Sequence, residues 1–154
     1  MLLGLDFDNT IAGYDWAFTN AARRRFYVSK TAIYSKREIK EITRSLSNGE
    51  EKWKALQGEV YGRGMKNAIL MPGLASFLKA CKFQNVPVVV VSHKTEYGHY
   101  DTDRINLREA ALNWMVNKGF FQREGFGLAM NSVYFETTRA QKIKRISDLG
   151  CTHF

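Results

Sequence analysis

Apolar and polar residues along the chain form blocks that predict strands and helices in alternation. Residues 2–7 are a short apolar run, typical of a buried strand, and residues 85–92 contain consecutive valines that predict a central parallel strand. Residues 132–136 predict another strand, and residues 151–154 the beginning of one more. With helices expected between them, this order predicts an α/β fold built on a doubly wound parallel sheet.

One long helical segment interrupts the alternation. Residues from about 16 to 64 carry apolar residues at helical spacing and contain no convincing strand. Ser35 and Glu38 have the spacing of a helix capping box, and so have Ser47 and Glu50. The sequence therefore predicts a helical insertion after the first strand.

Three more helices are expected among the later strands. The first presents an apolar face that includes Phe77, and the second begins at Asp101 or Thr102. Thr138 and Gln141 form a third capping box, which predicts the start of the last helix. These helices supply the layers that a doubly wound sheet needs on its faces.

The composition fits a globular protein. The 154 residues are 45% hydrophobic and 13% aromatic, which is enough for the core of one domain with a small insertion and argues against disorder. No apolar run approaches the roughly 18 residues of a membrane-spanning helix, and no basic segment precedes the first apolar run as in a signal peptide. We expect a cytoplasmic protein without membrane contact, with Cys81 and Cys151 as free thiols.

The chain is basic, because 23 lysines and arginines against 15 aspartates and glutamates give a net charge of +8. Such a surface attracts anions, including phosphates, although lysines and arginines that merely solvate helices are the alternative explanation. No basic and aromatic repeat typical of RNA binding is present, so a nucleic-acid partner is not favoured. The sequence does not decide whether the chain forms a homo-oligomer.

Two aspartates follow the first strand directly. Asp6 and Asp8 stand at its carboxyl end, where open α/β sheets bind ligands, and Asn9 and Thr10 come next. This segment resembles motif I of the haloacid dehalogenase-like (HAD) hydrolases, hydrophobic-Asp-x-Asp-x-Thr. The resemblance implies that Asp6 attacks phosphorus, that Asp8 transfers the proton, and that both hold a Mg²⁺ ion. Asn9 and Thr10 are then expected to contact the substrate.

The residue that ends the valine strand fits the second motif of this family. Ser92 stands there, and the resemblance implies that its hydroxyl and the amide of His93 hold the transferring phosphoryl group. His93 and Lys94 are expected to line the substrate pocket, with an ordinary surface loop as the equal alternative. Residues 97–101 follow, and we expect either a substrate loop or a plain connection.

The third motif of the family is a lysine near the start of the last helix. Lys142 is the expected residue, with Arg139 and Lys144 as rivals on the same helix. The resemblance implies that its charge stabilises Asp6 and the phosphate. The fourth motif consists of acidic residues after a further strand. Because the sequence ends at Phe154, the resemblance implies a chain truncated before that motif.

The resemblance also implies a domain organisation and a reaction. Residues 1–13 and 67–154 would form a Rossmann-like core, and residues 14–66 a helical cap that selects the substrate. Asp8 favours phosphate transfer over dehalogenation, because dehalogenases lack the second aspartate. We expect a Mg²⁺-dependent phosphomonoesterase that acts on a small phosphorylated metabolite through an aspartyl-phosphate. The motifs do not distinguish a phosphatase from a phosphomutase. The alternative function is a catalytically impaired module that binds a phosphorylated ligand or a protein.

Overall fold

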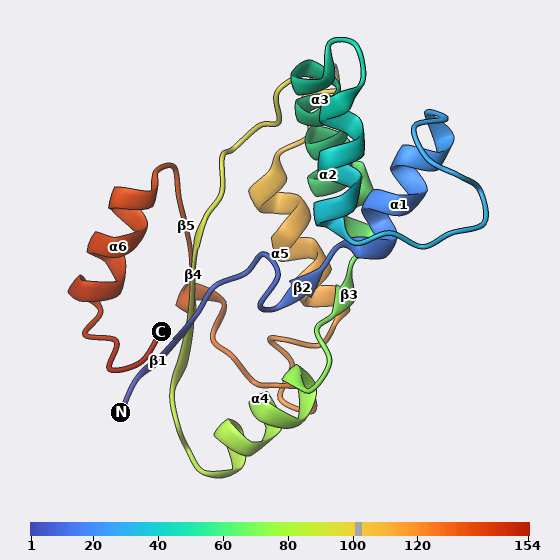
Figure 1. The fold of residues 1–154 in the computed structure, drawn as a ribbon. Coiled ribbons are helices and arrows are strands. Elements are labelled where there is room, and N and C mark those ends of the chain that lie inside the picture. Colours follow the sequence, from blue (N-terminus) through green and yellow to red (C-terminus); the bar gives the residue numbers. More distant parts are fainter. Residues whose placement is uncertain (101–102) are drawn as a thin grey trace. The chain divides into compact units, whose positions relative to one another are not determined.

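The chain folds around a parallel three-stranded sheet, in a computed structural model that describes residues 1–100 and 103–154 (Figure 1). The strand order is β1 (Leu3–Leu5), β4 (Val88–His93) and β5 (Val133–Glu136). The predicted central position of the valine strand is confirmed. His153 forms a parallel bridge with Leu3, which confirms that residues 151–154 begin to pair with the sheet.

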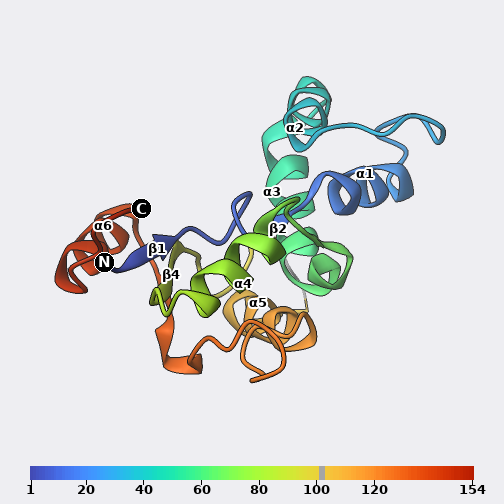
Figure 2. The same cartoon turned by 90° about the horizontal axis from the view of Figure 1, so that it is seen from below.

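Helices lie on both sides of this sheet. In two perpendicular views, α6 (Arg139–Asp148) lies on one side of the strands and α4 (Leu74–Phe83) on the other (Figures 1 and 2). The ring of Phe7, just after β1, is fully buried and makes edge contacts with Trp114 at 5.8 Å and Phe135 at 5.9 Å. The fold is therefore mixed α/β, with its core against the strands.

The segment between the first and second strands of the sheet is mostly helical. It contains α1 (Asp15–Arg24), α2 (Lys36–Ser45), α3 (Gly49–Tyr61) and the 3₁₀ helix η1 (Arg63–Asn67). The capping box at the start of α2 is confirmed, because the Ser35 hydroxyl accepts from the Glu38 amide and the Glu38 carboxylate accepts from the Ser35 amide. An aromatic cluster around Phe18 forms the core of these helices.

Residues group into two compact units. The sheet unit comprises residues 1–12, 70–95 and 112–154, and the helical unit comprises residues 13–69 and 96–111. The chain passes between them within β2 (Ala12–Gly13), β3 (Ile69–Leu70) and α5 (Leu107–Asn117), and also between Thr95 and Glu96. Strands β2 and β3 pair with each other in a second small sheet. The division of the chain into a core and a cap over residues 14–66 stays a prediction.

Two details differ from the sequence-based predictions. Ser47 and Glu50 form no capping box: α3 has Asn48 at its N-cap, with a φ of 52° and no side-chain cap bond. The turn is set by close backbone approach, since a Cβ on Gly49 would lie 2.2 Å from the Arg44 carbonyl oxygen. Phe77 is 42% exposed instead of buried, because the inward stripe of α4 runs along the residues beside it.

Helix α5 begins later than predicted. The expected N-caps Asp101 and Thr102 lie outside the described residues. The side chain of Asn106 accepts hydrogen bonds from the amides of Arg108 and Glu109, as an N-cap does, and α5 begins at the residue after it. Among residues 1–100 and 103–154, no helix is long and apolar enough to cross a membrane.

Candidate functional site

The carboxylate of Asp6 is held by groups from separate elements of the sheet unit. Its Oδ1 accepts hydrogen bonds from the Ser92 hydroxyl at 2.9 Å and from the Phe7 amide at 2.8 Å. Its Oδ2 pairs with the Lys142 ammonium at 2.7 Å. Asp6 follows β1, Ser92 lies near the end of β4, and Lys142 lies in the first half of α6. The carboxylate is thus fixed in orientation, yet its side chain stays 35% exposed.

The carboxylate of Asp8 has a buried lysine as its partner. The ammonium of Lys94 lies 3.1 Å from each of the two oxygens of Asp8, and its side chain is only 3% exposed. The same ammonium lies 5.4 Å from the centre of the Phe7 ring. A buried ammonium is costly unless it is paired, so this contact fixes both the lysine and Asp8.

A tight turn positions the residues after Asp8. The amides of Ile11 and Ala12 both donate to the carbonyl of Phe7, and the amide of Asn9 donates to the carbonyl of Ala12. Asn9 has a φ of 62°, in the left-handed region that asparagine tolerates better than most residues. This turn explains why the chain reverses directly after the two aspartates, with Ile11 and Ala12 buried.

The two aspartates open into a pocket of about 560 Å³ that lies entirely within the sheet unit. Its polar wall consists of Asp6, Asp8, Asn9, Ser92, His93, Arg139 and Lys142, and its apolar wall of Ile143, Ile146 and Phe154. A volume of this size lies in the range of pockets that hold small molecules. Its hydroxyl and its cations can bind an anionic ligand, and its carboxylates can accept protons or bind a cation.

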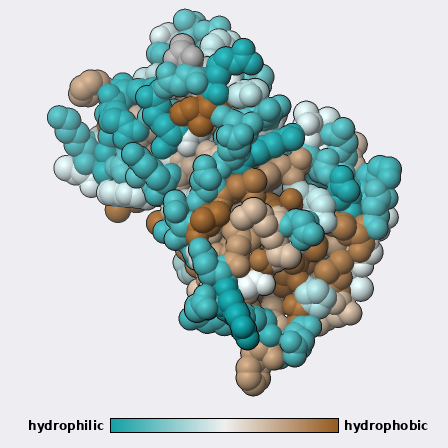
Figure 3. Space-filling model, turned by 180° about the vertical axis from the view of Figure 1, so that it is seen from behind, coloured by the Kyte–Doolittle hydropathy of each residue, from teal (hydrophilic) through white to brown (hydrophobic). Residues whose placement is uncertain are grey.

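A second pocket of the sheet unit has a different character. It measures about 310 Å³, lies at the amino end of β4 and is lined mainly by apolar side chains of residues 86–89 and 126–129. Hydrophobic residues also gather on the face of the sheet unit seen in Figure 3. None of the predicted site residues lines this second pocket, so it is not where the chemistry is expected.

The three rival cations of α6 occupy different positions. Lys142 contacts Asp6, and Arg139 lines the pocket beside it. Lys144 instead pairs with Asp148 at 2.7 Å, in an exposed ion pair one helical turn apart. Because Lys144 points away from the pocket, the geometry favours Lys142 as the cation next to Asp6.

Most of the predicted site residues come together, and two occupy unexpected positions. Thr10 is exposed and does not line the pocket. Lys94 lies behind Asp8 instead of on the pocket wall, so its position suits fixing Asp8 better than contacting a substrate. The sequence carried no signal for the Lys94–Asp8 pair, because neither the strand pattern nor the family motifs placed a lysine beside Asp8. It also gave no reason to place Phe154 on the pocket wall.

The donors at the site suit a hard cation. Mg²⁺ prefers oxygen ligands, and the carboxylate of Asp6 together with the backbone carbonyl of Asp8 would supply them. Within the described residues, however, no group of three or more histidine, cysteine, aspartate or glutamate side chains is placed to hold a metal ion. The site therefore offers a partial set of Mg²⁺ ligands.

Comparison with known proteins adds no assignment, since no family model, curated protein or solved structure matches this chain. The functional interpretation thus depends on the geometry of the site and on the resemblance of its motifs.

Proposed function

We propose that this chain is a phosphomonoesterase of the HAD type, acting on a small phosphorylated metabolite through an aspartyl-phosphate. In this proposal the sheet unit is a doubly wound, Rossmann-like core, and residues 14–66 act as a helical cap. One observation carries the proposal: the Asp6 carboxylate, at the carboxyl end of β1, contacts both the Ser92 hydroxyl and the Lys142 ammonium. Two residues predicted from separate motifs thus meet on the carboxylate of a third, at an open pocket.

The residues then divide the chemistry as follows. A carboxylate oxygen of Asp6 attacks phosphorus, the ester oxygen leaves, and an aspartyl-phosphate forms. Lys142 balances the negative charge that accumulates on the nucleophile and the phosphoryl oxygens, and Ser92 donates a hydrogen bond to the phosphoryl group. Asp8 gives a proton to the leaving oxygen and later takes one from the water that hydrolyses the intermediate. Lys94 positions Asp8 for both steps.

A divalent cation belongs to this proposal as a cofactor. Mg²⁺ would be held by the Asp6 carboxylate and the Asp8 carbonyl, and when bound it reduces the repulsion between the carboxylates and the phosphate. The chain's own residues still orient the nucleophile and move the proton.

The test is hydrolysis of p-nitrophenyl phosphate with Mg²⁺ by the full chain and by Asp6→Asn. We expect turnover by the full chain and a loss of at least about 10³-fold in the variant, because the amide is a far weaker nucleophile. Asp148→Asn removes an exposed carboxylate of the same unit and serves as the control. Turnover that survives Asp6→Asn, or no turnover of any phosphate monoester in a broad panel, contradicts the proposal.

A second candidate function is a phospho-ligand-binding module without catalysis. It is favoured by one observation: each of the two carboxylates already has a lysine partner, which lessens the need for a metal ion. This candidate predicts that phosphate binding, measured by calorimetry, barely changes with Mg²⁺ and that no ester is hydrolysed. A strong Mg²⁺ dependence of binding contradicts it.

A further inference from the structure

The charges around the pocket do not cancel completely. Asp6 pairs with Lys142 at 2.7 Å and Asp8 pairs with Lys94 at 3.1 Å, so two negative and two positive groups balance each other. Arg139 lines the same pocket as a third cation. In the part of the chain that the structure describes, Arg139 makes no ion pair, and the carboxylates of Glu136 and Asp148 pair with Arg145 and Lys144. The pocket therefore keeps one positive charge for an anion other than Asp6 and Asp8.

The position of Arg139 in α6 is unfavourable for the helix itself. Arg139 is the first residue of α6, and no acidic residue lies in that first turn. Helix N-termini carry a partial positive charge, so a cation there is repelled instead of stabilised. The capping needs of this end are met without Arg139, because Thr138 and Gln141 form a complete capping box. Helix stability thus gives no reason for an arginine at this position.

The pocket has room for more than a phosphoryl group. Its volume of about 560 Å³ suits a whole small metabolite. Ile143 and Phe154 line it while remaining 57% and 55% exposed, which provides an apolar wall for a short carbon skeleton. A substrate held at Asp6 by its phosphoryl group can therefore extend along this wall within the same pocket as Arg139.

From these observations we infer that Arg139 binds a second anionic group of the substrate. The inference deepens the proposed function and rests on it: the pocket would select small phosphate monoesters that carry a carboxylate or a second phosphate. A guanidinium suits either group, because its planar donors bind both oxygens of a carboxylate or a phosphate at once. Arg139 is then a specificity-determining residue, distinct from the groups that act on the reacting phosphorus.

The test uses three two-carbon esters that differ only at the far end. Phosphoglycolate carries a carboxylate, ethylene glycol bisphosphate a second phosphate, and 2-hydroxyethyl phosphate a neutral hydroxyl. We expect Arg139→Gln to lower kcat/KM about 10- to 100-fold on one or both of the doubly anionic esters, the size expected for a hydrogen bond to a charged group. On 2-hydroxyethyl phosphate the change should stay within about twofold. The comparison of the two anionic esters shows which group Arg139 prefers.

Lys144→Gln is the matched control, because it removes the same charge from the same helix outside the pocket. It should leave all three esters unaffected. The melting temperature of Arg139→Gln should equal or exceed that of the parent chain, since the repulsion at the helix N-terminus is removed. An equal loss on all three esters overturns the inference, because Arg139 would then act on the transferred phosphoryl group.

Binding measurements separate this inference from the proposed function. Phosphonoacetate and 2-hydroxyethylphosphonate are stable analogues of two of the esters, and their affinities are measured by calorimetry. If Arg139 binds a carboxylate, the chain should bind phosphonoacetate at least about tenfold more tightly, and Arg139→Gln should abolish that preference. If no ester is hydrolysed but this preference is found, the proposed function fails and the inference stands. If neither analogue is preferred, Arg139 does not bind a carboxylate, and the inference fails unless Arg139→Gln lowers kcat/KM selectively on ethylene glycol bisphosphate.

Discussion

The buried polar residues of the two units differ in what they contact. In the sheet unit, the buried polar residues Ser92 and Lys94 both contact an aspartate of the pocket. Among the described residues of the helical unit, the buried polar ones are Thr19 and Thr43. Thr19 only joins its helix to the backbone of Tyr34.

The ion pairs of the two units differ mainly at the pocket. In the sheet unit, the two aspartates of the pocket pair with Lys94 and Lys142, whose side chains are 3% and 14% exposed. In the helical unit, Arg44–Glu50 and Arg63–Asp103 lie on the surface, whereas Glu59, whose side chain is 12% exposed, pairs with Arg24 and Arg25, and none of these three residues lines the pocket. Burying charged groups costs free energy. Two largely buried lysines paired with the aspartates of one pocket therefore indicate that the sheet unit is organised around that pocket. The helical unit is organised around an aromatic core.

The largest effect is expected from removing the centre of that aromatic core. Phe18 is fully buried, stacks on Trp53 with 5.1 Å between ring centres, and contacts Tyr14 and Tyr61 edge-on. Phe18→Ala should lower the free energy of unfolding by about 3–5 kcal/mol, measured by chemical denaturation. Trp16→Ala on the same helix, where the side chain is 44% exposed, should cost less than about 1 kcal/mol. Equal losses from the two variants would contradict an aromatic core.

A smaller but functional effect is expected from the buried lysine of the sheet unit. Lys94→Met should lower kcat about 100-fold, or about 3 kcal/mol, because Asp8 loses the group that positions it. KM should change little, since Lys94 does not line the pocket. Lys79→Met, an exposed lysine of the same unit, is the control in p-nitrophenyl phosphate assays. A raised KM with unchanged kcat would assign Lys94 to substrate binding instead.

Glu59 offers a pH-dependent contrast within the helical unit. Burial alone would raise its pKa, but hydrogen bonds and positive charge from Arg24 and Arg25 outweigh that effect and hold the pKa below the ordinary value of 4.5. A carboxylate with a lowered pKa stabilises the fold above its ordinary pKa, and this stabilisation is lost as the pH falls. Glu59→Gln should therefore lower the free energy of unfolding by about 1 kcal/mol at neutral pH.

The difference between Glu59→Gln and the parent chain should vanish as the pH falls through the folded-state pKa of Glu59, as measured by urea denaturation across pH. Glu41→Gln is the matched control, because Glu41 is exposed and its nearest contact to Arg37 is 3.8 Å. That variant should stay within about 0.5 kcal/mol of the parent at every pH. A Glu59→Gln effect that does not change with pH would contradict the assigned cause.

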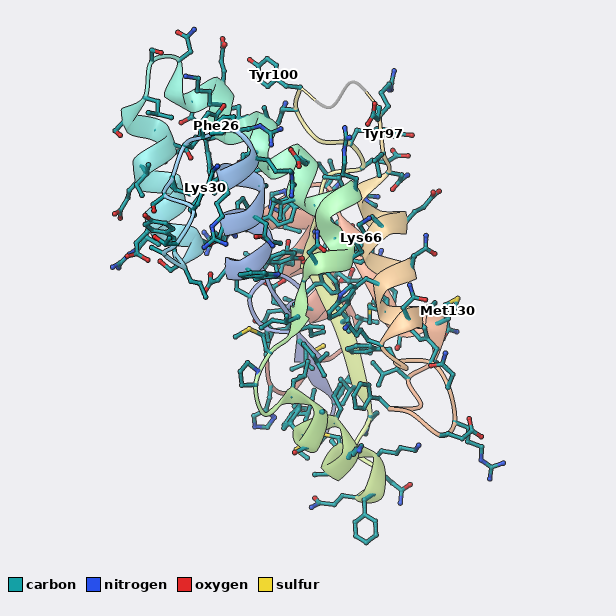
Figure 4. All side chains as sticks on the ribbon, turned by 90° about the vertical axis from the view of Figure 1, so that its right-hand side faces the viewer. Phe26, Lys30, Lys66, Tyr97, Tyr100 and Met130 are labelled. Atoms are coloured by element: carbon teal, nitrogen blue, oxygen red, sulfur yellow. The ribbon has the colours of Figure 1, made fainter. Side chains whose placement is uncertain are left out.

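The smallest effect concerns the end of α1 and has the opposite sign. Phe26 has a φ of 57° and an 82% exposed side chain, on the loop after α1 (Figure 4). The amide of Tyr27 donates to the carbonyl of Ala22, which is the helix ending that usually has glycine at the position of Phe26. Phe26→Gly should raise the free energy of unfolding by about 0.5–1 kcal/mol. Phe26→Ala keeps the strained backbone and should leave stability nearly unchanged in thermal melts.

Local signals predicted parts of the fold well. The capping boxes that begin at Ser35 and Thr138 needed only residues three positions apart, and both are present. The same spacing failed at Ser47, because the close packing of Gly49 against the Arg44 backbone decides where α3 begins. That packing is a tertiary constraint, and a pattern of neighbouring residues does not contain it.

The candidate site shows the same limit. The family resemblance implied that Asp6, Ser92 and Lys142 come together, and the structure brings them together where parallel strands present their carboxyl ends at one edge. The contact of Lys94 with Asp8 did not follow, since it depends on which way the chain turns after β4. Packing sets the direction in which a side chain points beyond the end of a strand. The sequence alone therefore did not decide whether Lys94 lines the pocket or lies in a surface loop.

The run of valines in β4 affects how the register of this strand in the sheet is determined. Val88, Val89, Val90 and Val91 are identical, so sliding this strand by one residue would leave the hydrophobic interior nearly as well filled. Only the polar residues beyond the run distinguish the correct alignment, because a slip would carry Ser92 and Lys94 away from their aspartates together. The residues proposed for chemistry thus also mark the register of the sheet, and a single insertion or deletion among the valines would abolish function before it abolished folding.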